Sequence, residues 1–476
     1  MLEYGYLAPA MFGGLILFML IGFPVAFSLA ALGLFFGFIA IEVGYFELAF
    51  LQALPFRVFG IMANDLLLAI PFFTFMGVIL ERSGLAEDLL EGVGQAFGAV
   101  PGGLAYAVIF VGAILGAITG TVAASVIAMG MISLPIMMKY GYDMKIATGV
   151  IAASGTITQV IPPSLVLIVL ADQLGVSVGD MYLGAFGPSV LQLALFVAFI
   201  FFVATFRPHK VPALPASART LRGWPLVAKI AWGIIPSVAL IFLVLGTIFL
   251  GFATPTEAGA MGAVGSMVLA VVHGRSSLAL LWSAMEQTMR ITAMVVFILI
   301  GATVFSLVFQ GVNGGRWIEH LLSGIPGGVI GFLIFVNVFI FFLAFFLDFF
   351  EIVFIVVPLL VPVAVSLDIN LVWFGVLLCV NMQTSFMHPP FGFALFYLRG
   401  IAPPEVKSRD IYLGSIPWIG LQVVLVAVLI FWPESVTYWL GNAVVLDDAA
   451  VTQSLDAIGL PELDLAPLDL GIAPKP

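Results

Sequence analysis

Long apolar segments separated by short polar stretches make up the chain from about residue 7 to residue 431. A helix that crosses the hydrocarbon core of a membrane needs about 20 residues, most of them apolar. The pattern therefore predicts membrane-spanning helices. Single uninterrupted crossings are expected over residues 7–21, 24–41, 65–82, 183–206, 231–250, 257–272, 291–310 and 416–431.

Two apolar segments, 103–135 and 327–362, are too long for one crossing and too short for two. The middle of the first is small and polar, and the middle of the second carries Asp348 and Glu351. Two half-helices that meet at a polar tip fit this pattern. Each segment is therefore predicted to form a re-entrant hairpin, which is tolerated at membrane depth where protein or water covers its backbone.

Two further spans, 146–170 and 371–398, are predicted to be broken helices. Each contains a polar stretch that runs into two prolines, SGTITQVIPPS from Ser154 and NMQTSFMHPPF from Asn381. Proline has no amide proton, so the helical ladder fails there and leaves backbone groups unpaired near the bilayer centre. The two proline pairs are Pro162-Pro163 and Pro389-Pro390.

The hairpin and the broken helix occur in the same order in both halves of the chain. The interval from Pro135 to Pro362 equals the interval from Pro162 to Pro389. Each copy ends in a related segment, YLGAFGPSVLQ from Tyr182 and YLGSIPWIGLQ from Tyr412. Such repeats are typical of secondary transporters. The expected organisation is a first half (1–206), a basic linker (207–230), a second half (231–435) and an acidic tail (436–476).

The composition agrees with a membrane protein, since 62% of residues are hydrophobic and 9% are charged, against about 25% charged in soluble domains. Placing the linker in the cytoplasm puts every Lys and Arg there except Arg57, Arg316 and Lys475. Both termini then lie outside, and the two repeats are inverted. The fold class predicted is an all-α polytopic membrane protein with inverted repeats, about ten spanning helices, two re-entrant hairpins and two broken helices.

Polar residues inside the apolar segments are the candidates for function. A carboxylate at the bilayer centre costs about 2.5–3.5 kcal/mol, so Asp348 and Glu351 are predicted to be functional, although Glu351 also fits a water-filled mouth. For His388, a hydrogen-bonded structural residue is favoured over a proton carrier.

Hydroxyl and carbonyl oxygens at the first hairpin tip and at both breaks are the hard ligands that a sodium ion takes. The alternative is local repair, in which the hydroxyls bond to carbonyls freed by the break. The residues concerned are Thr119, Thr121 and Ser125 at the tip, Ser154, Gly155, Thr156 and Thr158 at the first break, and Asn381, Gln383, Thr384 and Ser385 at the second.

The segment GFATPTEAGAMGAVG from Gly251 indicates the start of a helix. Thr254 suits the cap, a proline follows in the first turn, and Thr256 and Glu257 come next, where an acidic side chain complements the helix dipole. The small residues beyond allow close helix packing. A well-capped, tightly packed helix accounts for this motif.

Three motifs, ATPTEAGAMGAVG, SGTITQVIPPS and QTSFMHPPFGFALFYLRG, resemble the large membrane subunit of tripartite ATP-independent periplasmic (TRAP) transporters. The resemblance covers the chain to about residue 435. It implies a sodium-driven elevator transporter in the bacterial inner membrane, without a cofactor. It also implies a small four-helix membrane subunit, a periplasmic substrate-binding protein, and an organic acid such as a dicarboxylate or 2-oxo acid as substrate.

By this resemblance, sodium is held between each hairpin tip and its broken helix, with substrate between the two sites. The first site maps to Thr119, Gly120, Thr121, Ser125, Ser154, Gly155, Thr156 and Thr158. The second maps to Asp348, Glu351, Asn381, Met382, Gln383, Thr384 and Ser385. Substrate contacts map to Gln159, Ser125, His388 and Asp348. The chain departs from the family pattern in TGTVAAS at the first tip, where many members have SGSSAAT, and at His388, where threonine is common.

Other function classes fit the sequence less well. A membrane enzyme or redox subunit is disfavoured because the chain has four histidines and one cysteine, without spaced metal or haem pairs. An ion channel or proton-pumping antiporter subunit should show buried lysines and glutamates along several spans, and the spans here are nearly free of lysine. A carboxylate transporter that works without partners remains an alternative. No nucleic acid is expected to bind; the lipid bilayer is the surrounding medium.

Overall fold

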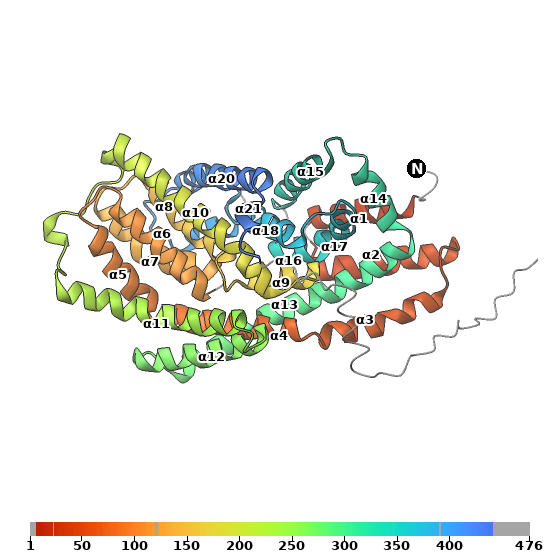
Figure 1. Cartoon of the computed structure of the whole chain (residues 1–476), viewed down its shortest axis with the longest axis horizontal. Helices are drawn as coiled ribbons and strands as arrows, with labels where there is room; N and C mark the ends of the chain where they lie inside the picture. The colour runs from red at the N-terminus through yellow and green to blue at the C-terminus, as the bar shows by residue number, and fades with distance from the viewer. Residues whose placement is uncertain (1–5, 22, 120–121, 346, 390–391, 441–476) are drawn as a thin grey trace, which may run out of the picture. The chain divides into compact units, whose positions relative to one another are not determined.

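The computed structural model describes residues 6–21, 23–119, 122–345, 347–389 and 392–440, and these residues fold almost entirely into helices (Figure 1). Eight of the described helices are long and apolar enough to cross a membrane. The expectation of an all-α polytopic membrane protein is therefore confirmed. Residues 441–476, which include most of the predicted acidic tail, lie outside the described part.

The first half begins with two short spans and ends with a long one. Its helices are α1 (Leu7–Ile21), α2 (Val25–Glu42), α3 (Ala53–Met62), α4 (Asp65–Arg82), α5 (Leu85–Phe97), α6 (Gly103–Thr119), α7 (Val122–Lys139), α8 (Met144–Thr156), the short η2 (Ile157–Gln159), α9 (Leu165–Leu174) and α10 (Val178–Phe206). The predicted hairpin 103–135 is the pair α6–α7, and the broken span 146–170 is α8–η2–α9.

The second half repeats this order. Its helices are α11 (Trp224–Phe249), α12 (Pro255–Val272), α13 (Leu278–Gly311), α14 (Gly314–Ser323), α15 (Gly328–Leu343), α16 (Phe349–Glu351), the π-helix η5 (Ile352–Val356), α17 (Val357–Ser366), α18 (Leu371–Met382), η6 (Gln383–Met387), α19 (Phe393–Ile401), α20 (Ser408–Phe431) and α21 (Glu434–Thr437). The hairpin 327–362 corresponds to α15 to α17, and the broken span 371–398 to α18–η6–α19.

Three boundaries differ from the sequence predictions. The linker ends at residue 223 rather than 230, because α11 begins at Trp224. The span expected over 291–310 is part of one helix of 34 residues, α13, which begins earlier, at Leu278. A bend of 46° separates residues 48–62 from α4, and the bent pair together is long and apolar enough for a broken span or a re-entrant loop, which the sequence did not indicate.

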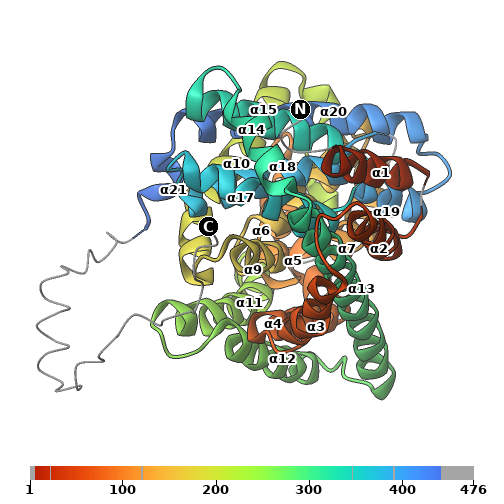
Figure 2. The ribbon, with the colours of Figure 1, turned by 90° about the vertical axis from the view of Figure 1, so that its right-hand side faces the viewer.

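Helices of the two halves form two packed groups. In the scaffold layer, as we call α2, α4, α11, α12 and α13, α12 packs against α4 and α13 packs against α2. The helices α11 and α12 lie on the side opposite α15 and α20 (Figures 1 and 2). The other group shares one hydrophobic core, built from α5 to α8, α10, α19 and α20, which includes residues of both halves.

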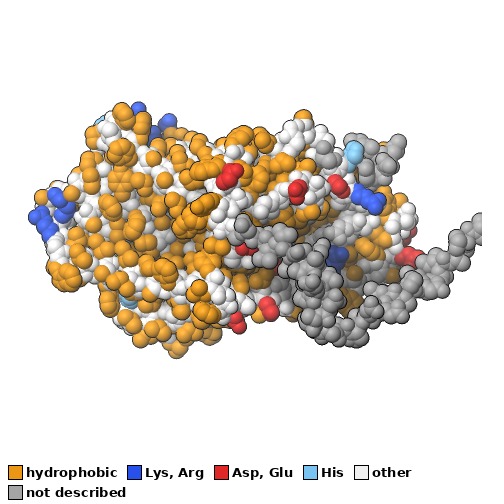
Figure 3. Space-filling view, in the orientation of Figure 1, with side chains coloured by type: hydrophobic (Ala, Val, Ile, Leu, Met, Phe, Trp, Pro, Cys, Tyr) orange, Lys and Arg blue, Asp and Glu red, His pale blue; other side chains and the backbone are white. Residues whose placement is uncertain are grey.

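The surface carries apolar side chains along most of the long helices (Figure 3). Phe201 on α10, Phe242 on α11 and Val271 on α12 are all exposed. Large exposed apolar faces of this kind are unusual on soluble proteins and match a lipid environment. One group of Lys and Arg side chains lies at the left end of Figure 3, near the linker after α10.

Candidate functional site

Both broken helices are interrupted in the polar, proline-containing stretches where the sequence predicted a break. The first runs as α8 to Thr156, continues for one short turn, and resumes at α9, whose start is capped by Ser164. The second runs as α18 to Met382 and resumes at Phe393. Residues 147–160 are all buried, so this break is enclosed by protein and not exposed to lipid.

The hydroxyls at the breaks bond to nearby carbonyls. Thr156 and Thr158 donate to the carbonyls of Ala153 and Gly155 at 2.9 and 3.0 Å. In the second break, Thr384 donates to the Asn381 carbonyl at 2.7 Å, and Ser385 donates to that of Met382 at 2.6 Å. These bonds match the local-repair interpretation. Each hydroxyl oxygen still has lone pairs that a cation can use.

The first hairpin packs directly on the first break through glycines. A Cβ atom added at Gly116 of α6 would lie 2.8 Å from the Cα of Thr158. A Cβ atom at Gly155 would lie 2.2 Å from a methyl group of Val126 on α7. Only glycine permits this approach, so both arms of the hairpin cover the break. Ser125, next to Val126, is fully buried here, as is Ser154.

The second hairpin contacts the second break through polar and aromatic residues. The side-chain amide of Asn381 donates to the Asn337 carbonyl on α15 at 2.7 Å. The His388 ring stacks on Phe345, with ring centroids 4.1 Å apart, and meets Phe341 edge-on at 4.4 Å. Neither His388 nitrogen has a hydrogen-bond partner among the described residues. His388 is thus packed between aromatic rings and does not make the hydrogen bonds expected of it.

Asp348 and Glu351 form a capping box at the start of α16. The Asp348 carboxylate accepts from the Glu351 amide at 2.8 Å, and the Glu351 carboxylate accepts from the Asp348 amide at 2.9 Å. This arrangement satisfies two amides that the helix start would leave unpaired. Both carboxylates are half-buried, and they lie in the hairpin that packs on the second break.

A buried glutamine cluster, which we define as Gln192, Gln383, Gln422 and Thr156, joins the two breaks. The side-chain oxygen of Gln383 accepts from Gln192 at 2.7 Å and from Gln422 at 3.2 Å. Gln422 also donates to the hydroxyl of Thr156 at 3.2 Å. All four side chains are at most 1% exposed. A second link runs from the Cys379 thiol to the Gln159 carbonyl, 3.4 Å away.

Sequence reasoning missed the two flanking glutamines of this cluster. A signal was present, because Gln192 and Gln422 are the last residues of the two related segments that follow the breaks. Thr156 and Gln383 are also equivalent, since they are separated by the same interval as Pro162 and Pro389. The cluster is therefore built from two pairs of repeat-related residues.

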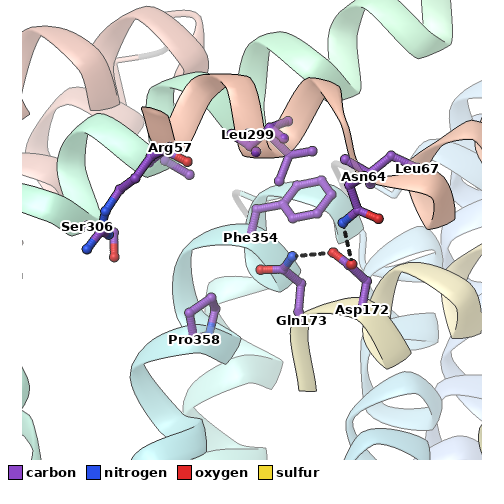
Figure 4. A pocket seen from close by; sticks show the side chains of 13 residues that line it. Arg57, Asn64, Leu67, Asp172, Gln173, Leu299, Ser306, Phe354 and Pro358 are labelled. Carbon is purple, nitrogen blue, oxygen red and sulfur yellow. Dashed lines mark hydrogen bonds between the residues drawn. The ribbon is translucent and has the colours of Figure 1, made fainter. Parts of the chain in front are cut away.

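A pocket of about 420 Å³ is lined by residues of α3, α4, α9, α13, η5 and α17 (Figure 4). Arg57 and Ser306 line one end. At the other end, Asp172 accepts from the side-chain amides of Asn64 at 2.7 Å and Gln173 at 2.8 Å. None of these residues was a sequence candidate, because α3, α9 and α13 meet only in the folded chain.

Several predicted residues lie elsewhere or outside the described part. Gly120, Thr121 and Pro390 are not among the described residues, and neither is the side chain of Thr119. Thr254 and Glu257 form a capping box, with bonds of 2.8 and 3.3 Å. Thr256 donates to the Asp65 carbonyl at 2.6 Å and ties α12 to α4. The capped-helix interpretation is thus confirmed, and this motif belongs to the scaffold layer and not to the breaks.

Comparison with known proteins gives a consistent family. The profile described as "Tripartite ATP-independent periplasmic transporter, DctM component" matches residues 12–435. The C4-dicarboxylate TRAP transporter large permease protein DctM of Rhodobacter capsulatus is 30% identical over 454 residues, covering 91% of this chain and 99% of the relative. The DctM protein of Pseudomonas aeruginosa is 29% identical over 395 residues, covering 82% and 90%.

The fold also matches a solved transporter. The crystal structure of the Alcanivorax borkumensis YdaH transporter aligns with a TM-score of 0.59, covering 80% of this chain and 87% of that one. The sequence identity is 16%, so this likeness concerns the fold alone. The family assignment rests on the matching family profile and on the relatives found by sequence. The chain belongs to the DctM family, the large permease subunits of tripartite ATP-independent periplasmic transporters.

Proposed function

We propose that this permease imports an organic acid across the bacterial inner membrane, coupled to sodium, by an elevator movement. A periplasmic substrate-binding protein delivers the acid, and a small four-helix membrane subunit packs on the scaffold layer. The observation that carries the proposal is the joint burial of two interrupted helices. Each is in contact with its hairpin, and the glutamine cluster joins them.

Sodium coupling rests on the chemistry of the breaks. They offer hydroxyl, amide and carbonyl oxygens in an enclosed setting, and the described residues contain no group of three or more His, Cys, Asp or Glu suited to a transition metal. Hard oxygen ligands suit a small alkali cation. Asp348 adds a negative charge on the hairpin that contacts the second break, where it offsets the charge of an arriving cation.

The cost of separating a hairpin from its break supports the proposal of an elevator movement. Sliding α6 past Thr158 would uncover unpaired backbone at membrane depth, at several kcal/mol for each group. Moving hairpins and breaks together avoids that cost. The scaffold layer would stay fixed, and its exposed apolar faces on α11 and α12 offer a surface for the small subunit.

Reconstitution tests the coupling. The permease, its small subunit and its binding protein are placed in proteoliposomes, with the radiolabelled acid that the binding protein binds most tightly in calorimetry. An inward sodium gradient should drive accumulation, and omission of the binding protein should abolish it. Uptake driven by a proton gradient without any sodium response would refute sodium coupling. Uptake without the binding protein would favour the partner-independent alternative.

Cross-linking tests the movement. Gly179 on α10 and Ile248 on α11 face each other across the two groups, since a Cβ at Gly179 would lie 4.0 Å from an Ile248 methyl. A disulfide between cysteines at these positions should therefore stop uptake until it is reduced. A matched pair, Gly37→Cys and Val308→Cys, lies within the scaffold layer, where a Cβ at Gly37 would be 3.2 Å from a Val308 methyl. That disulfide should leave uptake running. The reverse pattern would rule out the elevator.

A further inference from the structure

The pocket between α3, α9 and α13 has one cationic end and one anionic end (Figure 4). Arginine is a permanent cation, and Arg57 forms no ion pair with any described residue. Beside it lies Ser306 of α13, and Thr303 of the same helix also lines the pocket, so two hydroxyls are available. A guanidinium with neighbouring hydroxyls is suited to a carboxylate, because charge-assisted hydrogen bonds are about twice as strong as neutral ones.

The opposite end of the pocket is suited to a different group. The two oxygens of Asp172 accept one bond each, from Asn64 and from Gln173. Asn64 is fixed in turn, since its side-chain oxygen accepts from the Leu66 amide at 2.9 Å. A carboxylate held in this way attracts a hydrogen-bond donor or a cation and repels a second carboxylate.

The volume of the pocket and its expected position on the outer side of the membrane suit a small, delivered ligand. The volume of about 420 Å³ falls within the range of about 300–1,000 Å³ that is common for small-molecule sites. Phe354 and Leu299 lie between the two polar ends and give the middle an apolar wall (Figure 4). In the orientation expected from the sequence, Arg57 is one of the few cations on the outer side of the membrane, where a delivered acid arrives.

We propose that this pocket is an outer binding site for a monocarboxylate that carries a hydroxyl or ammonium group at its far end. The proposal rests on the function given above and narrows its substrate class. Arg57 binds the carboxylate, and Asp172 accepts from the far group. The site selects against dicarboxylates, because their second carboxylate would face Asp172.

A labelling experiment reads the pocket directly. Gly60 lines the pocket and has open space where a Cβ would stand, so Gly60→Cys places a thiol there without a clash. The natural Cys379 is fully buried, and wild-type protein sets the background. Maleimide labelling is followed in detergent with four acids of equal chain length, which are butyrate, 4-hydroxybutyrate, 4-aminobutyrate and succinate.

The expected order of protection places 4-hydroxybutyrate and 4-aminobutyrate first, then butyrate, then succinate. Arg57→Gln should raise every half-protective concentration about tenfold or more, and Arg57→Lys should restore part of the loss. Asp172→Asn should improve protection by succinate several-fold. Equal protection by succinate and 4-hydroxybutyrate in the Gly60→Cys protein, or protection that is unchanged in Arg57→Gln, would overturn the proposal.

This readout is independent of coupling. Labelling requires neither an ion gradient nor the binding protein, so it succeeds or fails apart from the sodium-driven uptake test. If the acids protect in the expected order but uptake is driven by protons, the proposed binding site is supported and sodium coupling is refuted. If uptake is driven by sodium but none of the four acids protects, sodium coupling is supported and the proposed binding site is refuted.

Discussion

Replacing Gln383 with leucine probes the junction of the two breaks. The substitution removes the oxygen that accepts from both Gln192 and Gln422. Gln422 keeps Thr156 as an acceptor, but the side-chain amide of Gln192 has no other acceptor among the described bonds. A buried donor left without a partner costs about 1–3 kcal/mol. We therefore expect Gln383→Leu to lower the free energy of unfolding by about 1–3 kcal/mol.

The partner substitution should cost less. In Gln192→Leu, Gln383 still accepts from Gln422, so no buried group loses its last partner. The expected loss is about 0.5–1.5 kcal/mol, the net value of one hydrogen bond. In the double variant, no Gln192 amide remains to be left unpaired. Its loss should therefore not exceed that of Gln383→Leu alone, which makes the two changes strongly non-additive.

The measurement is the midpoint of thermal unfolding of the purified permease in one detergent, with sodium-driven uptake recorded in parallel. A fall in uptake is expected in Gln383→Leu, because the substitution removes hydrogen bonds through which the cluster links the two breaks. A double variant whose loss equals the sum of the single losses would show that Gln192 and Gln383 do not interact. Equal losses in the two single variants would refute the assignment of Gln383 as the shared acceptor.

Three further outcomes are expected. Asp348→Asn keeps an oxygen that can cap Glu351, so unfolding should change little while sodium-driven uptake falls sharply; unchanged sodium dependence would contradict this. Thr254→Ala should cost about 0.5–1 kcal/mol of stability and Thr254→Ser should recover most of it, as melting curves can check. Burial acts to raise the pKa of Asp143, but the hydrogen bond and charge of Lys210, 2.9 Å away, and backbone amides outweigh it and lower that pKa. The stabilisation that the ionised Asp143 gives the folded state is therefore present above the ordinary aspartate pKa and is lost as pH falls through the lowered pKa. The difference in unfolding free energy between wild type and Lys210→Met should accordingly shrink in acid.

Local signals predicted the parts of the site that depend on neighbours in sequence. Proline lacks the amide proton that the helical ladder needs, and a proline pair after a polar stretch marked both breaks, at Pro162-Pro163 and Pro389-Pro390. Single prolines such as Pro71 and Pro188 remain inside continuous helices. Thr254 and Glu257 bond within one turn, and their spacing alone indicated the cap. The start of the span expected at residue 291, directly after the charged Arg290, was wrong, because α13 begins at Leu278. Arg290 pairs with Glu286 at 2.7 Å one turn earlier, and α13 continues through both residues.

Contacts between distant segments could not be predicted in the same way. Asp172 meets Asn64 only because α9 resumes after its break beside the start of α4. The pattern of apolar residues gives the length of each helix but not its neighbours. The partner of Asn381 is likewise a carbonyl on α15, which no motif around Asn381 indicates.

The glutamine cluster connects the repeat seen in the sequence with the mechanism proposed for the fold. Thr156 and Gln383 occupy equivalent positions, one in each predicted ion site, and Gln422 bonds to both. Amides supply donors and acceptors at this depth without the cost of a charge, which a glutamate would bring. Because Gln422 bonds to a group in each break, we expect a sodium ion that shifts Thr156 to disturb Gln383 as well. Coupling of this kind is reciprocal, so we expect occupation of either ion site to change the affinity of the other by the same factor.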